Sequence, residues 1–380
     1  MFKQKIKEKL AADIRRLKDR RGFVRAGLPR FGRLFGRDSL IVSWQLLDFD
    51  PGIAKKTLRI LSETEGRKFD RLREEEPGKI LHETNGKTHP ERPAIPFPYY
   101  GSVDSTPLFI IVFWFYCRKT GDFGFARKHW PNIKKAVLWM INFGDADGDL
   151  FLEYERKNPC GLFHQGWKDA FRNHLKIKPP AAVVEAQGYQ YLALRAAAGF
   201  GAKFNEKDFS RKLKRRAARL KEKFNRRFWW KKEKYFYLGL DGKKKPRRAV
   251  TSNPGHLLFT GILGRGRAKA VVRRLFRPDM FTEFGIRTHS AEEKDFAPRS
   301  YHLGSVWPHD NWIIYRGLKK SGFRREAEKI KKALLGVYEH FGCIPELYGV
   351  AGRKIVKIPN ACAPQGWASA ALLDLLRSPD

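Results

Sequence analysis

Apolar residues recur every three or four positions along most of the chain, which is the period of a helix with one buried face. Twelve segments show this period, and their ends carry helix-starting and helix-stopping residues, as in Asp50-Pro51-Gly52 and Ser321-Gly322. The predicted helices span residues 2–20, 38–49, 51–66, 105–120, 124–143, 181–199, 206–227, 252–263, 265–276, 308–321, 323–341 and 364–377. The pattern therefore predicts an all-α protein.

Six longer segments rich in Gly, Pro, Trp, Tyr and Asp separate these helices. They span residues 22–37, 67–104, 144–180, 228–251, 278–307 and 342–363. Loops of this length are uncommon in a compact domain unless they carry function. They follow alternate helices or nearly so, which places most of them on one face of a closed helical array. We expect an (α/α)6 barrel, a six-hairpin toroid with short β-hairpins among its loops.

The chain reads as one domain over residues 1–380, because no Pro/Gly/Ser linker divides it and no internal repeat is visible. The most apolar run, residues 107–117, is too short to span a bilayer, so we expect a buried helix and no membrane. The first residues are basic, but the residues that follow alternate charged and apolar with helical period and do not form the apolar core of a signal peptide. We therefore expect no signal peptide. The thiols form no CxxC pair and suggest a reducing, cytoplasmic location; they are Cys117, Cys160, Cys343 and Cys362.

The charge is strongly unbalanced: 77 Lys and Arg against 40 Asp and Glu leave a formal net charge of +37. Such a surface attracts polyanions such as RNA, DNA or an anionic membrane. The cations are spread over predicted helix faces throughout the chain and are not gathered beside one aromatic strand. We therefore expect at most weak, non-specific polyanion binding.

One acidic turn raises the question of a metal. Residues 145–149 (DADGD) lead into a strand-like segment, as an Asx-rich turn before a hairpin does. An EF-hand calcium loop needs Gly at its sixth position and an acid at its twelfth, where this chain has Leu150 and Arg156. We expect no metal here.

Two loop segments each present one carboxylate among aromatic and small residues. Asp169 ends the segment from His164, and Glu346 lies between Cys343 and Gly349. Two carboxylates on separate loops can flank a glycosidic bond, and nearby Trp and Tyr side chains offer flat faces to a sugar ring.

Three further acids stand at predicted helix starts: Asp38, Asp104 and Asp310. Each could be a simple N-cap. Each also has Arg, Tyr or Trp close by in sequence, which favours sugar binding over capping for the set.

Other chemistries lack their motifs. The chain has no GxSxG elbow, P-loop, GxGxxG before a strand, or HExxH. His164 and His309 are isolated, so a zinc site is not expected. Of the chemistries considered, catalysis by carboxyl groups remains, and we expect it to need no metal or organic cofactor.

Seven motifs in one order resemble the amylo-alpha-1,6-glucosidase domain of glycogen debranching enzymes. They are Gly36 to Ile41 (GRDSLI), Lys79 to Glu83 (KILHE), Tyr100 to Leu108 (YGSVDSTPL), Gln165 to Asp169 (QGWKD), Glu185 to Tyr189 (EAQGY), Gly304 to Asn311 (GSVWPHDN) and Pro345 to Tyr348 (PELY). The resemblance runs from about residue 27 to residue 376 and implies membership of the six-hairpin glycosidases. That group also contains glucoamylase-like, trehalase-like and mannosylglycerate-hydrolase-like enzymes.

The resemblance implies that Asp169 is a general acid and Glu346 a general base, with inversion at the anomeric carbon. Inversion needs the carboxyl groups roughly 6.5–9.5 Å apart. Trp167 should desolvate Asp169, and Lys168 should point away from it. The implied sugar-binding residues are Arg37, Asp38, Tyr100, Asp104, Trp167, Lys168, Trp307, His309, Asp310, Gln365 and Trp367, with Glu185 and Gln187 as weaker candidates.

This sequence departs from the family pattern at two positions, with Ala170 where Ser commonly follows the acid and His164 where Asn is commoner. Nothing precedes the first predicted helix, so we expect the family's N-terminal β-sandwich to be absent, which affects branch-point specificity more than hydrolysis.

These features predict an inverting, exo-acting α-glycosidase, with an amylo-alpha-1,6-glucosidase-like enzyme as the main interpretation. The alternatives are a hydrolase of another α-glycoside, such as trehalose or a glycerate-linked sugar, and a non-catalytic polyanion-binding protein on the same fold. A phosphorylase is less favoured, because those enzymes use phosphate in place of the base that Glu346 would supply.

Overall fold

The computed structural model describes residues 2–84, 88–89 and 91–377. The helices are α1 Phe2–Leu17, α2 Gly36–Gln45, α3 Pro51–Glu63, α4 Ser105–Thr120, α5 Phe123–Lys128, α6 Trp130–Asn142, α7 Val184–Lys203, α8 Lys207–Arg227, the 3-10 helix η1 Asn253–Phe259, α9 Arg265–Leu275, α10 Pro308–Ser321, α11 Arg324–Phe341 and α12 Gly366–Arg377. The strands are β1 Leu34–Phe35, β2 Glu83–Thr84, β3 Thr88–His89, β4 Arg92–Pro96, β5 Ala182–Val183, β6 Trp229–Trp230, β7 Tyr235–Phe236, β8 Gly239–Leu240, β9 Pro246–Arg247, β10 Phe281–Thr282, β11 Gly285–Ile286, β12 Tyr348–Ala351 and β13 Lys354–Lys357.

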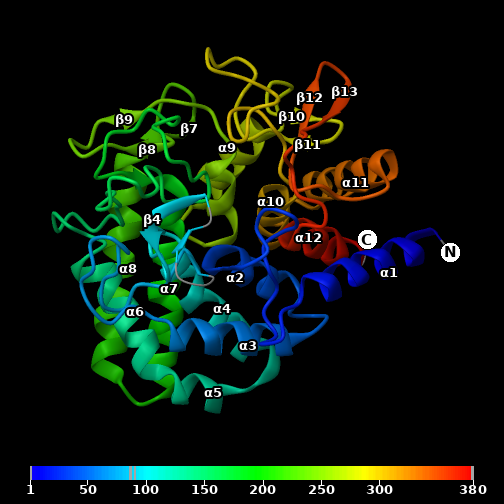
Figure 1. Ribbon diagram of the computed structural model, residues 1–380. Helices are drawn as coiled ribbons and strands as arrows, with labels where there is room; N and C mark the ends of the chain where they lie inside the picture. Colours follow the sequence, from blue (N-terminus) through cyan, green and yellow to red (C-terminus); the bar gives the residue numbers. More distant parts are fainter. Residues whose placement is uncertain (1, 85–87, 90, 378–380) are drawn as a thin grey trace.

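Six helical elements form a closed inner ring. α2 contacts α4, α4 contacts α7, α7 contacts η1, η1 contacts α10, α10 contacts α12, and α12 returns to α2. Along the chain each inner element follows an outer helix, in the order α1, α3, α6, α8, α9 and α11. The described chain is therefore six helical hairpins, which confirms the predicted (α/α)6 barrel. α1 packs on α12, so the first and last helices lie side by side (Figure 1).

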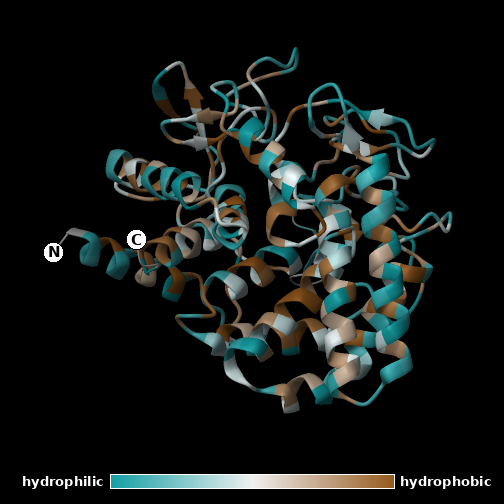
Figure 2. Cartoon of the chain, turned by 180° about the vertical axis from the view of Figure 1, so that it is seen from behind, coloured by the Kyte–Doolittle hydropathy of each residue, from teal (hydrophilic) through white to brown (hydrophobic). Residues whose placement is uncertain are grey.

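Burial differs between the two rings as this arrangement requires. Every residue of α2 is buried, whereas the outer helix α8 buries only Ser210, Leu213, Ala217, Leu220 and Phe224, spaced three or four apart. Figure 2 shows the outward side of α8 as mostly hydrophilic. The apolar run of residues 107–117 lies in α4 of the inner ring, as predicted. No described helix has the length and apolarity needed to cross a bilayer.

Two predicted helices differ from the structure. The segment 124–143 is broken between α5 and α6, because Pro131 falls in the first turn of α6 and cannot donate the backbone hydrogen bond that a continuous helix needs. The segment 252–263 is the 3-10 helix η1, with Pro254 in its first turn. α10 comes very close to η1: a Cβ on Gly317 would lie 2.5 Å from Cβ of Leu258.

The strands form small antiparallel ladders within the long loops: β1–β2, β3–β4, β5–β8–β9, β6–β7, β10–β11 and β12–β13. Figure 1 shows β7 to β13 gathered at one end of the helical array. β1 and β5 lead directly into inner helices α2 and α7. The loops that precede the inner helices thus bring distant segments together at one end.

Candidate active site

A cavity of about 450 Å³ lies among these loops. Seven of the residues predicted from the sequence line it: Arg37, Asp38, Trp167, Asp169, Trp307, Glu346 and Trp367. They come from segments more than 300 positions apart in the chain, and their convergence is the main result for the site. A pocket of this size accommodates a small sugar derivative.

Asp169 lies at the end of a tight loop, which the antiparallel bridge between His164 and Ala170 closes. Its carboxylate forms an ion pair with Arg37 and keeps 26% of its side-chain surface exposed. Burial raises the pKa of Asp169 to about 6, although the Arg37 guanidinium acts in the opposite direction. The group can therefore hold a proton in mildly acidic solution, which a general acid must do.

Lys168 points away from Asp169, as predicted. Its ammonium donates a 2.6 Å hydrogen bond to the carbonyl of Thr288, and the side chain is almost wholly buried. Burial lowers the pKa of Lys168 to about 8 against the effect of Asp310 and Glu185. The cation that contacts Asp169 is thus Arg37 and not its sequence neighbour.

Glu346 lies in the loop between α11 and β12 and is buried. Oε1 accepts a 2.5 Å hydrogen bond from the Tyr301 hydroxyl, and Oε2 accepts a 2.9 Å hydrogen bond from the backbone N–H of Cys362. Burial raises the pKa of Glu346, while these two donors favour its ionised form. The carboxylate is therefore fixed in orientation, which suits a general base.

Asp38 and Asp104 flank Arg37 in different ways. Burial raises the pKa of Asp38 to about 7 against Arg37, and the charges of Asp169 and Glu346 add to the rise. Asp104 occupies the N-cap position of α4 but makes no capping hydrogen bond. Its oxygens instead accept from Arg37 Nη1 at 3.0 and 3.2 Å, so the carboxylate holds the guanidinium in place from behind.

Aromatic side chains form one wall of the cavity. The His302 ring stacks on Trp307 with centroids 5.4 Å apart, and Trp167 meets both rings edge-on. Nε1 of Trp167 and of Trp367 and Nε2 of His302 are buried with no hydrogen-bond partner among the described residues. The wall thus offers flat ring faces to a sugar.

The other predicted binding residues lie outside the lining. They are Tyr100, Asp104, Lys168, His309, Asp310 and Gln365. The Tyr100 hydroxyl donates to the carbonyl of Thr64, and Asp310 accepts a 2.7 Å hydrogen bond from His256.

His309 and Gln365 both support Trp367. The His309 ring stacks on Trp367 at 3.7 Å, and Gln365 Oε1 accepts from the Trp367 backbone N–H at 2.9 Å. These two residues therefore support the wall from behind.

Glu185 and Gln187, the weaker candidates for sugar binding, also lie behind the aromatic wall of the cavity. Gln187 bonds the backbone N–H and carbonyl of Leu152 at 2.8 and 2.7 Å, which fixes a loop to α7. Glu185 is buried at the start of α7, and burial raises its pKa. Neither lines the cavity.

Sequence reasoning missed several lining residues. Tyr301 and His302 stand just before the Gly304 motif, in the long loop 278–307, whose sequence singles out neither residue. His82 and Glu83 belong to a motif used for the resemblance but given no role. The remaining lining residues are Ala26, Arg30, Phe31, Arg33, Phe35, His89, Glu91, Arg92, Leu162, Ala170, Phe171 and Arg172.

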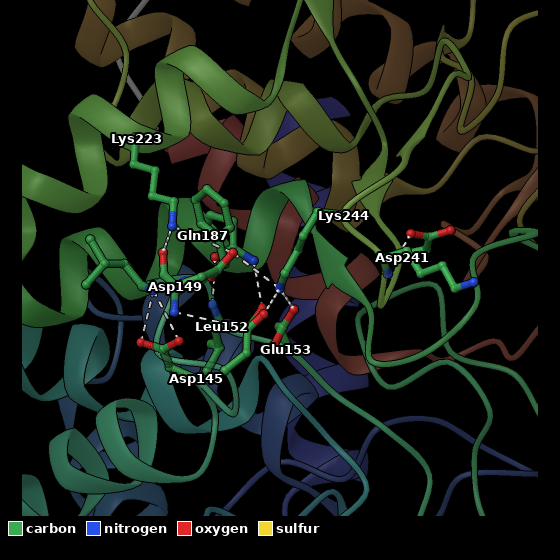
Figure 3. Close-up of polar contacts among 12 residues, drawn as sticks. Asp145, Asp149, Leu152, Glu153, Gln187, Lys223, Asp241 and Lys244 are labelled. Carbon is green, nitrogen blue, oxygen red and sulfur yellow. Dashed lines mark hydrogen bonds and ion pairs between the residues drawn. The ribbon is translucent and has the colours of Figure 1, made fainter.

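The acidic turn at residues 145–149 carries a lysine among its carboxylates. Asp145, Asp147 and Asp149 lie close enough to share an ion. Lys244 pairs with Asp149 at 3.2 Å and with Glu153 (Figure 3). It also pairs with Asp147 at 2.9 Å. The chain's own ammonium therefore supplies positive charge to this turn.

Comparisons with known proteins bear on the family. The model of the mannosylglycerate hydrolase MGH1-like glycoside hydrolase domain matches residues 142–344, more than half of the chain, and ends just before Glu346. Mannosylglycerate hydrolase of Rubrobacter radiotolerans is 30% identical over 137 residues, 33% of this chain and 31% of that protein. Mannosylglycerate hydrolase MGH1 of Selaginella moellendorffii is 31% identical over 84 residues, 22% of this chain and 17% of that protein. The chain thus aligns with less than a third of the length of these relatives.

Solved structures show the same fold. An uncharacterized conserved protein from Thermus thermophilus matches with a TM-score of 0.75 at 16% identity, covering 97% of this chain and 99% of that chain. GH63 mannosylglycerate hydrolase of the same organism, in complex with glucose, matches with a TM-score of 0.74 at 16% identity. The match covers 98% of this chain and 99% of that chain. The amylo-alpha-1,6-glucosidase interpretation is not confirmed, and the alternative of a glycerate-linked sugar is better supported. The chain belongs to the family of mannosylglycerate hydrolase MGH1-like glycoside hydrolase domains.

Proposed function

We propose that this chain hydrolyses, with inversion, an α-glycoside of a small hydroxy acid such as glycerate, which leaves through its hydroxyl oxygen and keeps a free carboxylate. The observation that carries the proposal is the convergence of Asp169, Glu346 and several arginines on one cavity of about 450 Å³. The family supplies the substrate class, since its named members are mannosylglycerate hydrolases.

Two carboxyl groups divide the chemistry. Glu346, the base, removes a proton from a water molecule as that water attacks the anomeric carbon. The bond from that carbon to the leaving oxygen breaks, and Asp169 gives its proton to this oxygen. The ring faces of Trp167, Trp307 and Trp367 in the cavity wall bind the sugar.

Positive charge on the cavity wall favours an anionic leaving group. Arg30, Arg92 and Arg172 line the cavity and form no ion pair with any described residue. Arg33 also lines it but is paired with Glu83 at 2.6 Å. A glycerate carboxylate would find unpaired guanidinium groups there, whereas a neutral glucan would leave them without an anion.

The first experiment compares mannosylglycerate and glucosylglycerate with maltose, isomaltose, limit dextrin and trehalose, with NMR reading the anomer first released. We expect the glycerate glycosides to be hydrolysed best, with the β-anomer released first from the α-linked substrate. Asp169→Asn and Glu346→Gln should each lower kcat by at least about 100-fold, and Asp208→Asn, on the exposed side of α8, is the matched control. Undiminished hydrolysis in both site variants would refute the assignment.

The second experiment tests the anionic leaving group. Arg92→Gln and Arg172→Gln should raise KM for the glycerate glycoside by roughly 10-fold, the loss of one charge-assisted contact. KM for the corresponding methyl glycoside should stay unchanged. Equal effects on both substrates would contradict recognition of the carboxylate.

A further inference from the structure

A second large hollow, the Trp229 groove, lies where the end of α8 meets the β6–β7 hairpin and the β8–β9 turn. Its volume is about 770 Å³, and it shares no lining residue with the central cavity. Three aromatic side chains line it: Trp229, Trp230 and Tyr237. Six cationic side chains line it as well: Arg226, Arg227, Lys231, Lys232, Lys244 and Arg248.

The positive charge of this groove is almost uncompensated. Of the six cations only Lys244 forms an ion pair with a described residue. No Asp or Glu of the described chain belongs to the lining. Crowded cations without counter-charges create a positive potential that concentrates anions. The sequence-based expectation that cations do not gather beside an aromatic strand is therefore wrong at β6.

The aromatic rings of the groove are partly exposed and packed against neighbouring side chains. Trp230 stacks on Tyr237 at 5.7 Å with an interplanar angle of 19°. Trp229 packs edge-on against Phe236, and the guanidinium of Arg267 lies 4.9 Å from its ring centroid. Rings held in this way are ready-made platforms for another flat group.

The charged surface continues beyond the groove. A neighbouring hollow shares Arg226, Trp229 and Lys231 with it and adds three cations, Lys221, Arg265 and Arg267, against one acid, Glu222. The outward side of α8, which leads into both hollows, is strongly hydrophilic (Figure 2). The feature is thus a track for an extended anion and not a cradle for one phosphate.

We propose that the Trp229 groove binds single-stranded nucleic acid, with phosphates on the cations and bases on the aromatic rings. This combination is the one that sequence-tolerant single-strand binding uses. A neutral sugar would need carboxylate or amide groups for its hydroxyls, and the described lining has no Asp, Glu, Asn or Gln. A lipid surface would meet a flat basic face and would not need a hollow lined by rings.

The first test separates the groove from general surface charge. Fluorescence polarisation measures binding of a labelled 12-nucleotide oligouridylate to the full chain between 50 and 200 mM salt. The groove variant neutralises Arg227, Lys231 and Lys232 to Gln. The matched control neutralises Arg324, Arg325 and Lys332 on α11 to Gln, with the same change in net charge.

We expect the groove variant to bind at least about 10-fold more weakly and the control to stay within about 2-fold. Each lost phosphate contact should reduce the slope of log affinity against log salt by about 0.7, or about 2 for three. Equal losses in the two variants would overturn the proposal, because binding would then follow overall charge.

The second test addresses stacking with Trp230→Leu and an abasic oligomer of equal length. Loss of one stacked base predicts roughly 10-fold weaker oligouridylate binding, with abasic oligomer and heparin binding unchanged. If Trp230→Leu leaves oligouridylate binding intact and heparin binds as tightly, the groove serves an anionic polysaccharide and the proposal fails. Far-UV circular dichroism and thermal melting confirm that each variant is folded.

Discussion

The hydroxyl of Tyr301 donates a 2.5 Å hydrogen bond to Oε1 of Glu346, from a loop 45 positions earlier in the chain. The phenol lines the cavity beside the carboxylate that we propose as the base. The contact fixes one oxygen while the Cys362 N–H holds the other. Tyr301 is therefore a positioning residue for the proposed base.

Tyr301→Phe should shift the acidic limb of the pH profile of kcat/KM to higher pH. Removing a donor to the ionised carboxylate raises the pKa of Glu346, so the base is protonated over a wider range. We expect about a 10-fold loss below the limb and a smaller loss above it. The control is Tyr116→Phe, which removes a hydroxyl that donates to Asp122 at the start of α5, outside the cavity lining. A uniform loss at every pH would show that the hydrogen bond does not tune the base.

Asp169 should set the alkaline limb. Its pKa of about 6 means that kcat/KM falls as pH rises through about 6 and the proposed acid loses its proton. Arg37→Met removes the cation that opposes burial, so the pKa of Asp169 rises further and the limb moves to higher pH. Lower overall activity is expected, because Asp104 loses its partner too. An unmoved limb would assign the titration to another group.

Glu65→Gln should stabilise the protein in neutral and alkaline solution. Glu65 is buried, its Oε2 accepts a 2.8 Å hydrogen bond from Asn132, and burial raises its pKa to about 7. A carboxyl group whose folded pKa is raised stabilises the fold fully below its unfolded pKa, and this stability is lost as pH rises toward 7. We expect a gain in unfolding free energy of up to about 3 kcal/mol at pH 8 and almost none at pH 4.

Urea unfolding at both pH values measures this gain. Glu339→Gln, on the exposed last turn of α11, is the control. A gain for Glu65→Gln that is equal at pH 4 and pH 8 would show that ionisation is not its cause.

Lys244→Met should destabilise the fold by about 2–3 kcal/mol, because Asp147 and Glu153 would lose their cation and Asp149 would keep only the longer 3.8 Å pair with Lys223. The exposed neighbour Lys243 provides a matched control as Lys243→Met. Thermal and urea unfolding compare the two. Equal stability of the two variants would mean that the ammonium contributes no more than a surface charge.

The fold was largely predictable because helix periodicity and helix breakers are local signals. Twelve periodic segments gave the six hairpins, and the errors lie where local and tertiary effects compete. At Pro131 a missing N–H divides an apolar stretch that otherwise reads as one helix. At η1, Gly317 of α10 packs closely against Leu258. This contact comes from a distant segment, so the sequence of residues 252–263 alone does not reveal it.

The site was predictable where the type of side chain alone indicates its role, as for the carboxyl groups of Asp169 and Glu346 and the ring faces of the tryptophans. It was not predictable where the contact partner decides the role. Asp104 and Asp310 look like binding acids in sequence, yet they face Arg37 and His256 from behind the wall. Tyr301 is one ordinary tyrosine in a long loop until the fold places it on Glu346.

Lys244 lies among the carboxylates of the 145–153 turn, so a side chain of the protein itself supplies the counter-charge there. A dissolved cation at such a turn must be captured, and its occupancy follows the concentration of the ion outside. The Lys244 ammonium is part of the chain, so it occupies its place among the carboxylates whenever the protein is folded. A chelator should therefore leave this turn folded as before, because the positive charge among its carboxylates belongs to the chain.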